Sequence, residues 1–150
     1  MITITNRQRK IAVSLDVMRK QVAAMLSVLR YDDFDIGILL TTDESIRRYN
    51  RDFRHKDKPT DILSFPFYPD LKPGERIKPL SQDEKNLGDI IISVAYVQRK
   101  SPEWNRTFEE HLTALLAHGI AHLLNYDHQT DEEFKVMQRV EKKLLKAVVS

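Results

Sequence analysis

The sequence contains no cysteine, so disulfide bonds and thiolate metal ligands are excluded. Histidine and carboxylate side chains are the metal ligands that remain, and they suit a catalytic zinc site better than a structural one. The absence of cysteine also fits the reducing cytoplasm, which is the location that we expect.

Long apolar runs are missing as well. Residues 1–10 contain no apolar stretch long enough for a signal peptide, and no later stretch is long enough to span a bilayer. We therefore expect a soluble intracellular protein without a membrane partner. The 150 residues, of which 41% are hydrophobic and 31% charged, predict a single globular domain over residues 1–150.

Apolar periodicity predicts a fold in which strands and helices alternate. Strands are expected within residues 2–13, 34–41, 62–66 and 88–92. Helices are expected over residues 15–29, 42–53, 93–100, 107–124 and 130–148. The expected fold class is α+β, with a small mixed sheet of about four strands packed with about five α-helices.

Three local signals refine this outline. Pro66 either ends the third strand or places it at a sheet edge. Residues 69–86 carry three prolines and mostly charged side chains, which predicts a long loop that is unusual unless it is functional or mobile. The last two helices begin with capping-box patterns, formed by Thr107 with Glu110 and by Thr130 with Glu133.

Three of the five histidines, His118, His122 and His128, lie within eleven residues. Residues four apart share a helix face, so the imidazoles of His118 and His122 can point at the same ion. On a continuous helix His128 would lie about 15 Å from His118, so the chain must leave the helix and fold back. Asn125 suits such a stop because asparagine tolerates the left-handed conformation. The segment therefore predicts a three-nitrogen metal site with an open coordination position.

Zinc, one ion per chain, is the metal that three imidazoles favour, although nickel or copper would bind the same ligands in vitro. Zinc lowers the pKa of its bound water to about 7, so the expected reaction is metal-assisted hydrolysis. The competing interpretation is a histidine pair that is packed or solvated by coincidence. His111 lies about 10.5 Å along the helix, too far to share the ion, and we expect it to be partly buried, solvent-facing or in the cleft lining. His55 is expected to be a loop or substrate contact.

The neighbours of the histidines bear on the chemistry. A helical zinc protease has a glutamate directly after its first histidine as general base, whereas this chain has Gly119 there. This difference counts against peptide hydrolysis and leaves the general base unassigned. Asp127 either orients a ligand histidine or caps the turn, and the sequence leaves both interpretations open.

A basic segment precedes the third strand. Six positive side chains and the carboxylates of Asp52 and Asp57 give this segment a net charge of +4, which exceeds the net charge of +2 of the whole chain. The positive side chains are Arg47, Arg48, Arg51, Arg54, Lys56 and Lys58. Such a run is often a solvated face, but four of the six are arginines, whose planar guanidinium pairs with phosphate oxygens. With a hydrolytic metal site that lacks a protease base, the run predicts a phosphodiester substrate and hence nucleic acid.

Three blocks of the sequence carry a family resemblance. They are His118-Gly-x-x-His122-Leu-x-x-Tyr126-Asp127-His128, the run from Phe53 to Pro66, and Leu87-Gly88-Asp89-Ile90. In order and content these blocks resemble the YbeY family of metal-dependent bacterial endoribonucleases, which act in ribosomal RNA maturation. Two positions depart from the family pattern, since Asn125 stands where glycine is usual and Ala121 where leucine is common.

The resemblance implies a zincin-like α+β fold, zinc bound by His118, His122 and His128, and Arg54 as the basic residue important for RNA cleavage. It also implies single-stranded RNA cleavage in 16S ribosomal RNA 3′-end processing and ribosome quality control, so the expected partners are RNA and the ribosome. Two alternatives stay open. One is a ribosome-associated RNA-binding protein with a structural metal, and the other is a metal-dependent hydrolase of another substrate.

Overall fold

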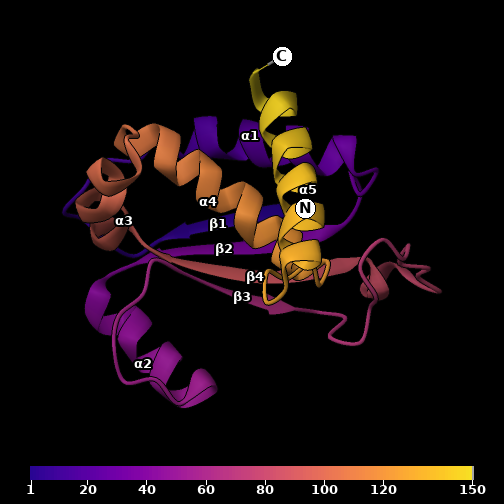
Figure 1. Ribbon diagram of the computed structural model, residues 1–150, viewed down its shortest axis with the longest axis horizontal. Helices are drawn as coiled ribbons and strands as arrows, with labels where there is room; N and C mark the ends of the chain where they lie inside the picture. Colours follow the sequence, from indigo (N-terminus) through magenta and orange to yellow (C-terminus); the bar gives the residue numbers. More distant parts are fainter. Residues whose placement is uncertain (150) are drawn as a thin grey trace.

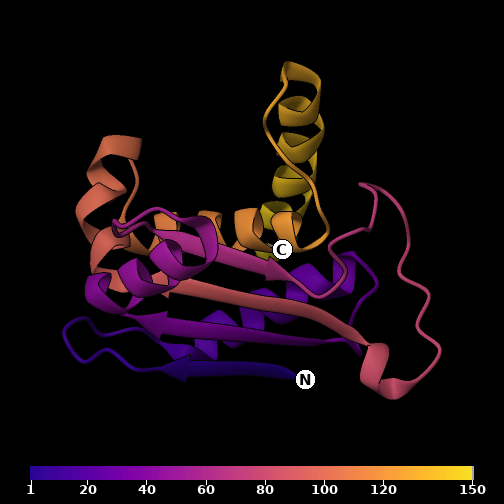
Figure 2. The ribbon, with the colours of Figure 1, turned by 90° about the horizontal axis from the view of Figure 1, so that it is seen from below.

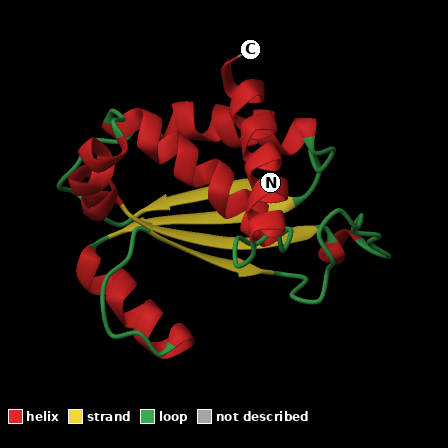
Figure 3. Ribbon diagram, viewed as in Figure 1, coloured by secondary structure: helices red, strands yellow, loops and turns green. Residues whose placement is uncertain are grey.

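The strands form one mixed sheet with a single antiparallel edge. The computed structural model describes residues 1–149, and Figures 1 and 3 show the sheet with its covering helices. The strands are β1 (Ile2–Asn6), β2 (Asp35–Thr41), β3 (Ile62–Pro66) and β4 (Asn86–Ser93). Their order is β1-β2-β4-β3, with β1, β2 and β4 parallel and β3 antiparallel to β4. Pro66 ends the edge strand β3, because proline cannot donate a ladder hydrogen bond.

Five α-helices and two short 3₁₀-helices accompany the sheet within residues 1–149. The α-helices are α1 (Leu15–Val28), α2 (Asp43–Arg54), α3 (Val94–Lys100), α4 (Phe108–Leu123) and α5 (Asp131–Val149). The 3₁₀-helices are η1 (Gln82–Glu84) and η2 (Ser101–Trp104). The expected α+β class with about four strands and five α-helices is confirmed. None of the described helices is long and apolar enough to cross a membrane.

The helices cover the two faces of the sheet unequally. α1, α4 and α5 pack together on one face, whereas α2 lies on the opposite face, onto which Figure 2 looks. The main core lies under the three packed helices, where buried Leu116 and Ile120 of α4 meet Met25 of α1 and Ile90 of β4. A much smaller buried cluster on the opposite face consists of Ile46, Leu63 and Ile91.

The first strand is short, as expected, and it uses only the beginning of the alternating pattern. β1 ends at Asn6, so Ile11 and Val13 lie outside it. The buried side chain of Gln8 turns the chain there, since its Nε2 donates to the Ile11 carbonyl at 2.7 Å and its Oε1 accepts from the Ile11 amide at 3.0 Å. Ile11 and Val13 pack against the core from the connection rather than from the strand.

Residues 69–85 form the predicted long connection, with η1 as their one regular element, and Asn86 already belongs to β4. This connection is attached to the end of α1. Arg76 lies over the ring of Tyr31 at 3.9 Å and donates to the Leu29 carbonyl at 2.6 Å. Ile77 is buried, and its amide donates to the Tyr31 hydroxyl at 3.1 Å. The middle of the connection is therefore fastened to the body of the protein at Arg76 and Ile77.

The helix that carries two of the histidines begins where the sequence predicted. The Thr107 hydroxyl accepts from the Glu110 amide at 3.1 Å, and the Glu110 carboxylate accepts from the Thr107 amide at 2.9 Å. At the start of α5, the Thr130 hydroxyl likewise accepts from the Glu133 amide at 3.1 Å. Because α4 is capped at its start and buried along its length, its last turns hold a defined position against β3 and β4.

Candidate metal centre

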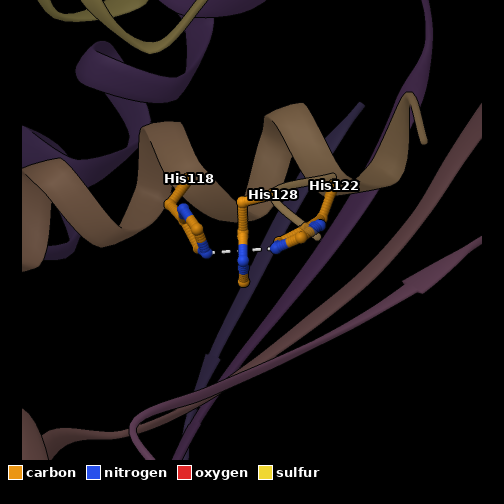
Figure 4. Close-up of side chains that lie close together, drawn as sticks. All are labelled: His118, His122 and His128. Atoms are coloured by element: carbon orange, nitrogen blue, oxygen red, sulfur yellow. Dashed lines mark hydrogen bonds between the residues drawn. The ribbon is translucent and has the colours of Figure 1, made fainter. Parts of the chain in front are cut away.

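Three imidazoles converge at the end of α4. His118 and His122 lie one turn apart on the helix, and His128 returns to them from the segment that follows (Figure 4). Each ring offers one nitrogen, and these nitrogens all lie within 4.8 Å of one another. The Nε2 atoms of His118 and His122 are 3.1 Å apart. Two nitrogens on one tetrahedral zinc would be about 3.4 Å apart, so the donor set fits one small ion.

A tight turn brings His128 back to the helix end. Asn125 adopts the left-handed conformation that the helix stop requires, with a φ of 66°, and its amide donates to the His122 carbonyl at 2.9 Å. The Asp127 carboxylate accepts from the His128 amide at 2.8 Å. Two interpretations were left open for Asp127, and this contact supports the one in which its side chain caps the turn.

Glu141 of α5 orients His118. Its Oε1 lies 3.0 Å from Nδ1 of His118, and the two side chains are 26% and 28% exposed. A carboxylate at Nδ1 holds the proton there, so the lone pair of Nε2 faces the other two histidines. The sequence analysis missed this residue. The signal was its position on the apolar stripe of α5, four residues after buried Met137 and three before buried Leu144.

The surroundings of His122 favour its neutral imidazole. Burial lowers the pKa of His122 below its ordinary value, and positive charge on His118 or His128 lowers it further. A neutral imidazole keeps the lone pair that a metal ligand needs. The side chain of His122 is therefore suited to binding a cation at neutral pH.

The histidines lie in a cleft of about 730 Å³ between the end of α4 and the edge strand β3. Residues 62–66 of β3 form one wall, and the turn from Asn125 to Gln129 borders the other. Phe53 and Arg54 at the end of α2, together with Thr60 and Asp61 before β3, complete the lining. The structure thus brings Arg54 into the same cleft as the three histidines, although about sixty residues of chain separate them.

The packing of α4 explains why a glycine follows the first histidine. A Cβ atom on Gly119 would lie 2.9 Å from Cδ1 of Ile62 and 3.0 Å from Cδ1 of Ile90. Any larger residue here would have to displace the ends of these two side chains, so the packing favours glycine over glutamate. The geometry therefore agrees with the sequence in disfavouring the base of a helical zinc protease.

The charges of the basic segment are partly neutralised. Arg47 forms a double hydrogen bond with Asp57, at 2.9 and 3.2 Å, and Arg51 pairs with Asp52 at 3.0 Å. The Arg54 guanidinium has no hydrogen bond or ion pair with any residue in the range 1–149. Its guanidinium is therefore available for an anionic ligand in the cleft.

Two other histidines lie outside the cleft. His111 was expected to be partly buried, solvent-facing or in the cleft lining, and this prediction is wrong, because it is 2% exposed and the cleft excludes it. It packs in the first turn of α4 against Trp104 of η2, with ring centroids 6.0 Å apart. Burial and the charge of Arg106 lower its pKa. His55 is exposed and ends α2 in the left-handed conformation, with a φ of 59°.

Asn125 makes a second contribution that the sequence analysis missed. Its side-chain Nδ2 donates to the carbonyls of Tyr68 and Leu71, at 2.7 and 2.8 Å. The residue that replaces the usual glycine therefore fastens the start of the 69–85 connection to the turn between His122 and His128. A glycine would allow the same backbone turn but would leave both carbonyls without this partner.

The comparisons with known proteins agree with the fold and identify the family. The family described as Endoribonuclease YbeY matches residues 3–149. A human protein named Endoribonuclease YbeY is 36% identical over 144 residues, which cover 96% of this chain and 86% of that protein. A protein of the same name from Thermoanaerobacter sp. (strain X514) is 36% identical over 150 residues, covering 96% and 94%. The solution structure of TM1509 from Thermotoga maritima has a similar fold, with a TM-score of 0.59, 23% identity and coverage of 97% and 90%. The chain therefore belongs to the endoribonuclease YbeY family.

Proposed function

We propose that this protein is a zinc-dependent endoribonuclease that cleaves single-stranded RNA. Its substrate in the cell is 16S ribosomal RNA, cut during 3′-end processing, and it also acts in ribosome quality control in the cytoplasm. Residues 1–150 act as one domain. Membership of the family supports the reaction class. The observation that carries the proposal is the convergence of three histidine nitrogens in a cleft that Arg54 also lines.

Each part of the cleft has a role in this proposal. His118, His122 and His128 hold the zinc, and Glu141 keeps His118 in the required tautomer. Zinc, when bound, supplies a Lewis acid and a water of lowered pKa. Arg54 binds oxygens of the phosphate and stabilises the negative charge that develops on them during cleavage. A single strand suits the cleft, because its unpaired bases can turn away from the backbone.

The metal half of the proposal is tested by zinc content and cleavage together. Wild-type protein should contain one zinc per chain and cut a labelled single-stranded RNA, with the cutting lost in chelator and restored by zinc. His128→Ala should lose most bound zinc, whereas His55→Ala, a histidine outside the cleft, should keep both zinc and activity. Chelation that unfolds the protein would instead indicate a structural metal. Equal zinc affinity in wild type and His128→Ala would reject the ligand set.

The role of Arg54 in this proposal is tested by measuring zinc content and RNA cleavage separately in a variant that lacks its charge. Arg54→Ala should retain zinc and fold but lose about 100-fold or more in cleavage rate, the size of effect seen when one transition-state donor is removed. Arg48→Ala is the matched control, because Arg48 lies on the same helix but outside the cleft lining. Wild-type cleavage by Arg54→Ala would remove this residue from the mechanism.

A further inference from the structure

A second hollow adjoins the metal cleft on the open face of the sheet. It has a volume of about 520 Å³, its floor is formed by the four strands, and α2 forms one wall. Figure 2 looks onto this face, where α2 is the helix in front of the strands. Phe53 and Phe65 line both the hollow and the metal cleft, so the two spaces share a wall.

The wall shared by the two spaces is aromatic. Phe53 is 64% exposed, although a ring of this size is usually buried. It stacks on Tyr49 with ring centroids 6.3 Å apart, and it meets Phe65 edge-on at 5.3 Å. These two contacts hold the ring in one orientation with an open face. An exposed ring that is held in this way is the type of surface on which nucleobases stack.

One row of residues across the floor of the hollow contains a carboxylate. Thr3, Gly37, Asp89 and Phe65 are paired in register from β1 to β3. Gly37 has no side chain, and the Asp89 carboxylate occupies the space that a Cβ atom would need. The carboxylate of Asp89 forms no hydrogen bond or ion pair with any residue of the described chain. An ionised carboxylate of this kind accepts hydrogen bonds from a ligand.

The charges along the two spaces suit a nucleic-acid strand. Arg54, which lines the metal cleft, directly follows Phe53, which borders the hollow. A phosphate held by Arg54 and the base held against Phe53 would thus belong to the same short stretch of strand. Lys56 and Lys58 follow in the chain, and neither has a carboxylate partner within residues 1–149.

We propose that the hollow is a nucleobase subsite, in which Phe53 stacks one base of the bound strand and Asp89 accepts from that base. This inference rests on the proposed function, which supplies single-stranded RNA as the ligand. Cytosine, adenine and guanine each carry an exocyclic amino group that can donate to a carboxylate. Uracil has only its ring N3–H as a donor on that edge, and the two carbonyl oxygens that flank it repel a carboxylate. The subsite therefore selects amino-bearing bases over uracil, and it does so independently of the metal.

The test measures binding by the full chain after removal of metal with a chelator, so that RNA is bound without being cut. Labelled oligocytidylate and oligouridylate of about ten nucleotides, within the range of known site sizes, are titrated by fluorescence anisotropy. Wild type should bind oligocytidylate more tightly. Phe53→Leu should weaken binding of both oligomers about tenfold, since it removes one stacking contact. Phe53→Trp should restore the affinity.

Two matched controls accompany these variants. Phe67→Leu replaces another exposed aromatic residue, 46% exposed, which lines neither space, and its affinity should match wild type. Asp89→Asn should remove the preference for oligocytidylate, because an amide donates as well as accepts. Asp32→Asn changes an exposed carboxylate outside both spaces and should retain the preference. Circular dichroism and thermal melting establish that each variant is folded.

Salt dependence separates the base contact from the phosphate contacts. Phe53→Leu should leave the slope of log affinity against log salt unchanged, whereas Arg54→Ala should reduce it by about 0.7, the value for one phosphate on a single strand. Equal affinities in Phe53→Leu and wild type, or equal losses in Phe53→Leu and Phe67→Leu, would overturn the subsite alone.

Two other outcomes have their own meaning. Normal RNA binding by Phe53→Leu with a changed sedimentation coefficient would assign the hollow to a second copy of the chain and overturn the subsite. Wild type that neither binds nor cuts RNA would overturn the proposed function together with this inference.

Discussion

The contact between Glu141 and His118 yields a quantitative prediction about metal affinity. Glu141→Gln keeps the length of the side chain and one acceptor oxygen but removes the charge. Hydrogen-bond partners of metal-bound histidines contribute about tenfold to 100-fold in affinity, which is about 1.4–2.7 kcal/mol. Because glutamine still accepts from Nδ1, we expect a loss of about tenfold for Glu141→Gln and about 100-fold for Glu141→Ala.

The structure supports a sizeable effect. The Oε1 to Nδ1 distance is 3.0 Å, and both side chains are more than two-thirds buried, so solvent screens the contact weakly. The effect on folding should be smaller. One hydrogen bond between α4 and α5 contributes about 1 kcal/mol to the free energy of unfolding of the metal-free protein.

The assay is a competition titration at pH 7 between the protein and a chromophoric zinc chelator. Glu132→Gln, on the same helix and exposed, is the matched control and should have wild-type affinity. A urea titration of each metal-free variant measures the folding term separately. If Glu141→Ala bound zinc as tightly as wild type, the carboxylate would not orient the ligand and the reasoning would be refuted.

Asn125, Gly119 and His111 each carry a further prediction. Asn125→Gly keeps the left-handed turn but loses two hydrogen bonds, so the free energy of unfolding should fall by about 1–3 kcal/mol and amide exchange over Tyr68–Leu71 should accelerate. Asn105→Gly, at another left-handed position, should leave that exchange unchanged, and equal exchange in both variants would contradict the role of Asn125. Gly119→Glu should be destabilised by about 1–3 kcal/mol, because the side chain would have to displace the ends of Ile62 and Ile90, and a wild-type melting temperature would contradict this. The pKa of His111 is lowered in the folded protein, so the unfolded chain binds the proton first as pH falls. The contribution of His111 to the stability of the metal-free protein is therefore fully present above about pH 6.5 and is lost as the pH falls below that value. His111→Gln should reduce this dependence in urea titrations, and identical pH profiles would contradict it.

The parts of the fold that the sequence predicted depend on local interactions. The start of α4 was predictable because Thr107 and Glu110 are three residues apart and satisfy each other's amides. The helix stop was predictable because Asn125 is one of the few residue types that adopt the left-handed conformation readily. The end of β1 was not, because it depends on how the Gln8 side chain bonds to the main chain of Ile11.

The same distinction applies to the site. His118, His122 and His128 come from one short stretch, so their spacing alone predicted that they meet. Glu141 reaches His118 only because α5 packs against α4, and the amide of Asn125 reaches carbonyls more than fifty residues away. Such contacts depend on tertiary packing, and hydrophobic periodicity predicts that two helices pack without predicting which polar side chains meet between them.

The packing of α4 links the choice of substrate to the fold. Gly119 packs against the side chains of Ile62 and Ile90, so a glutamate at this position would have to displace both. The cleft runs along the edge strand β3 and reaches the end of α2, where Phe53 and Arg54 lie. A substrate that enters along this edge meets an unpaired guanidinium and an exposed aromatic ring on its way to the histidines. A polymer that repeats a phosphate and a planar base matches these groups in order, whereas a peptide offers neither. One packing contact thus disfavours peptide hydrolysis and leaves open the path that suits an RNA strand.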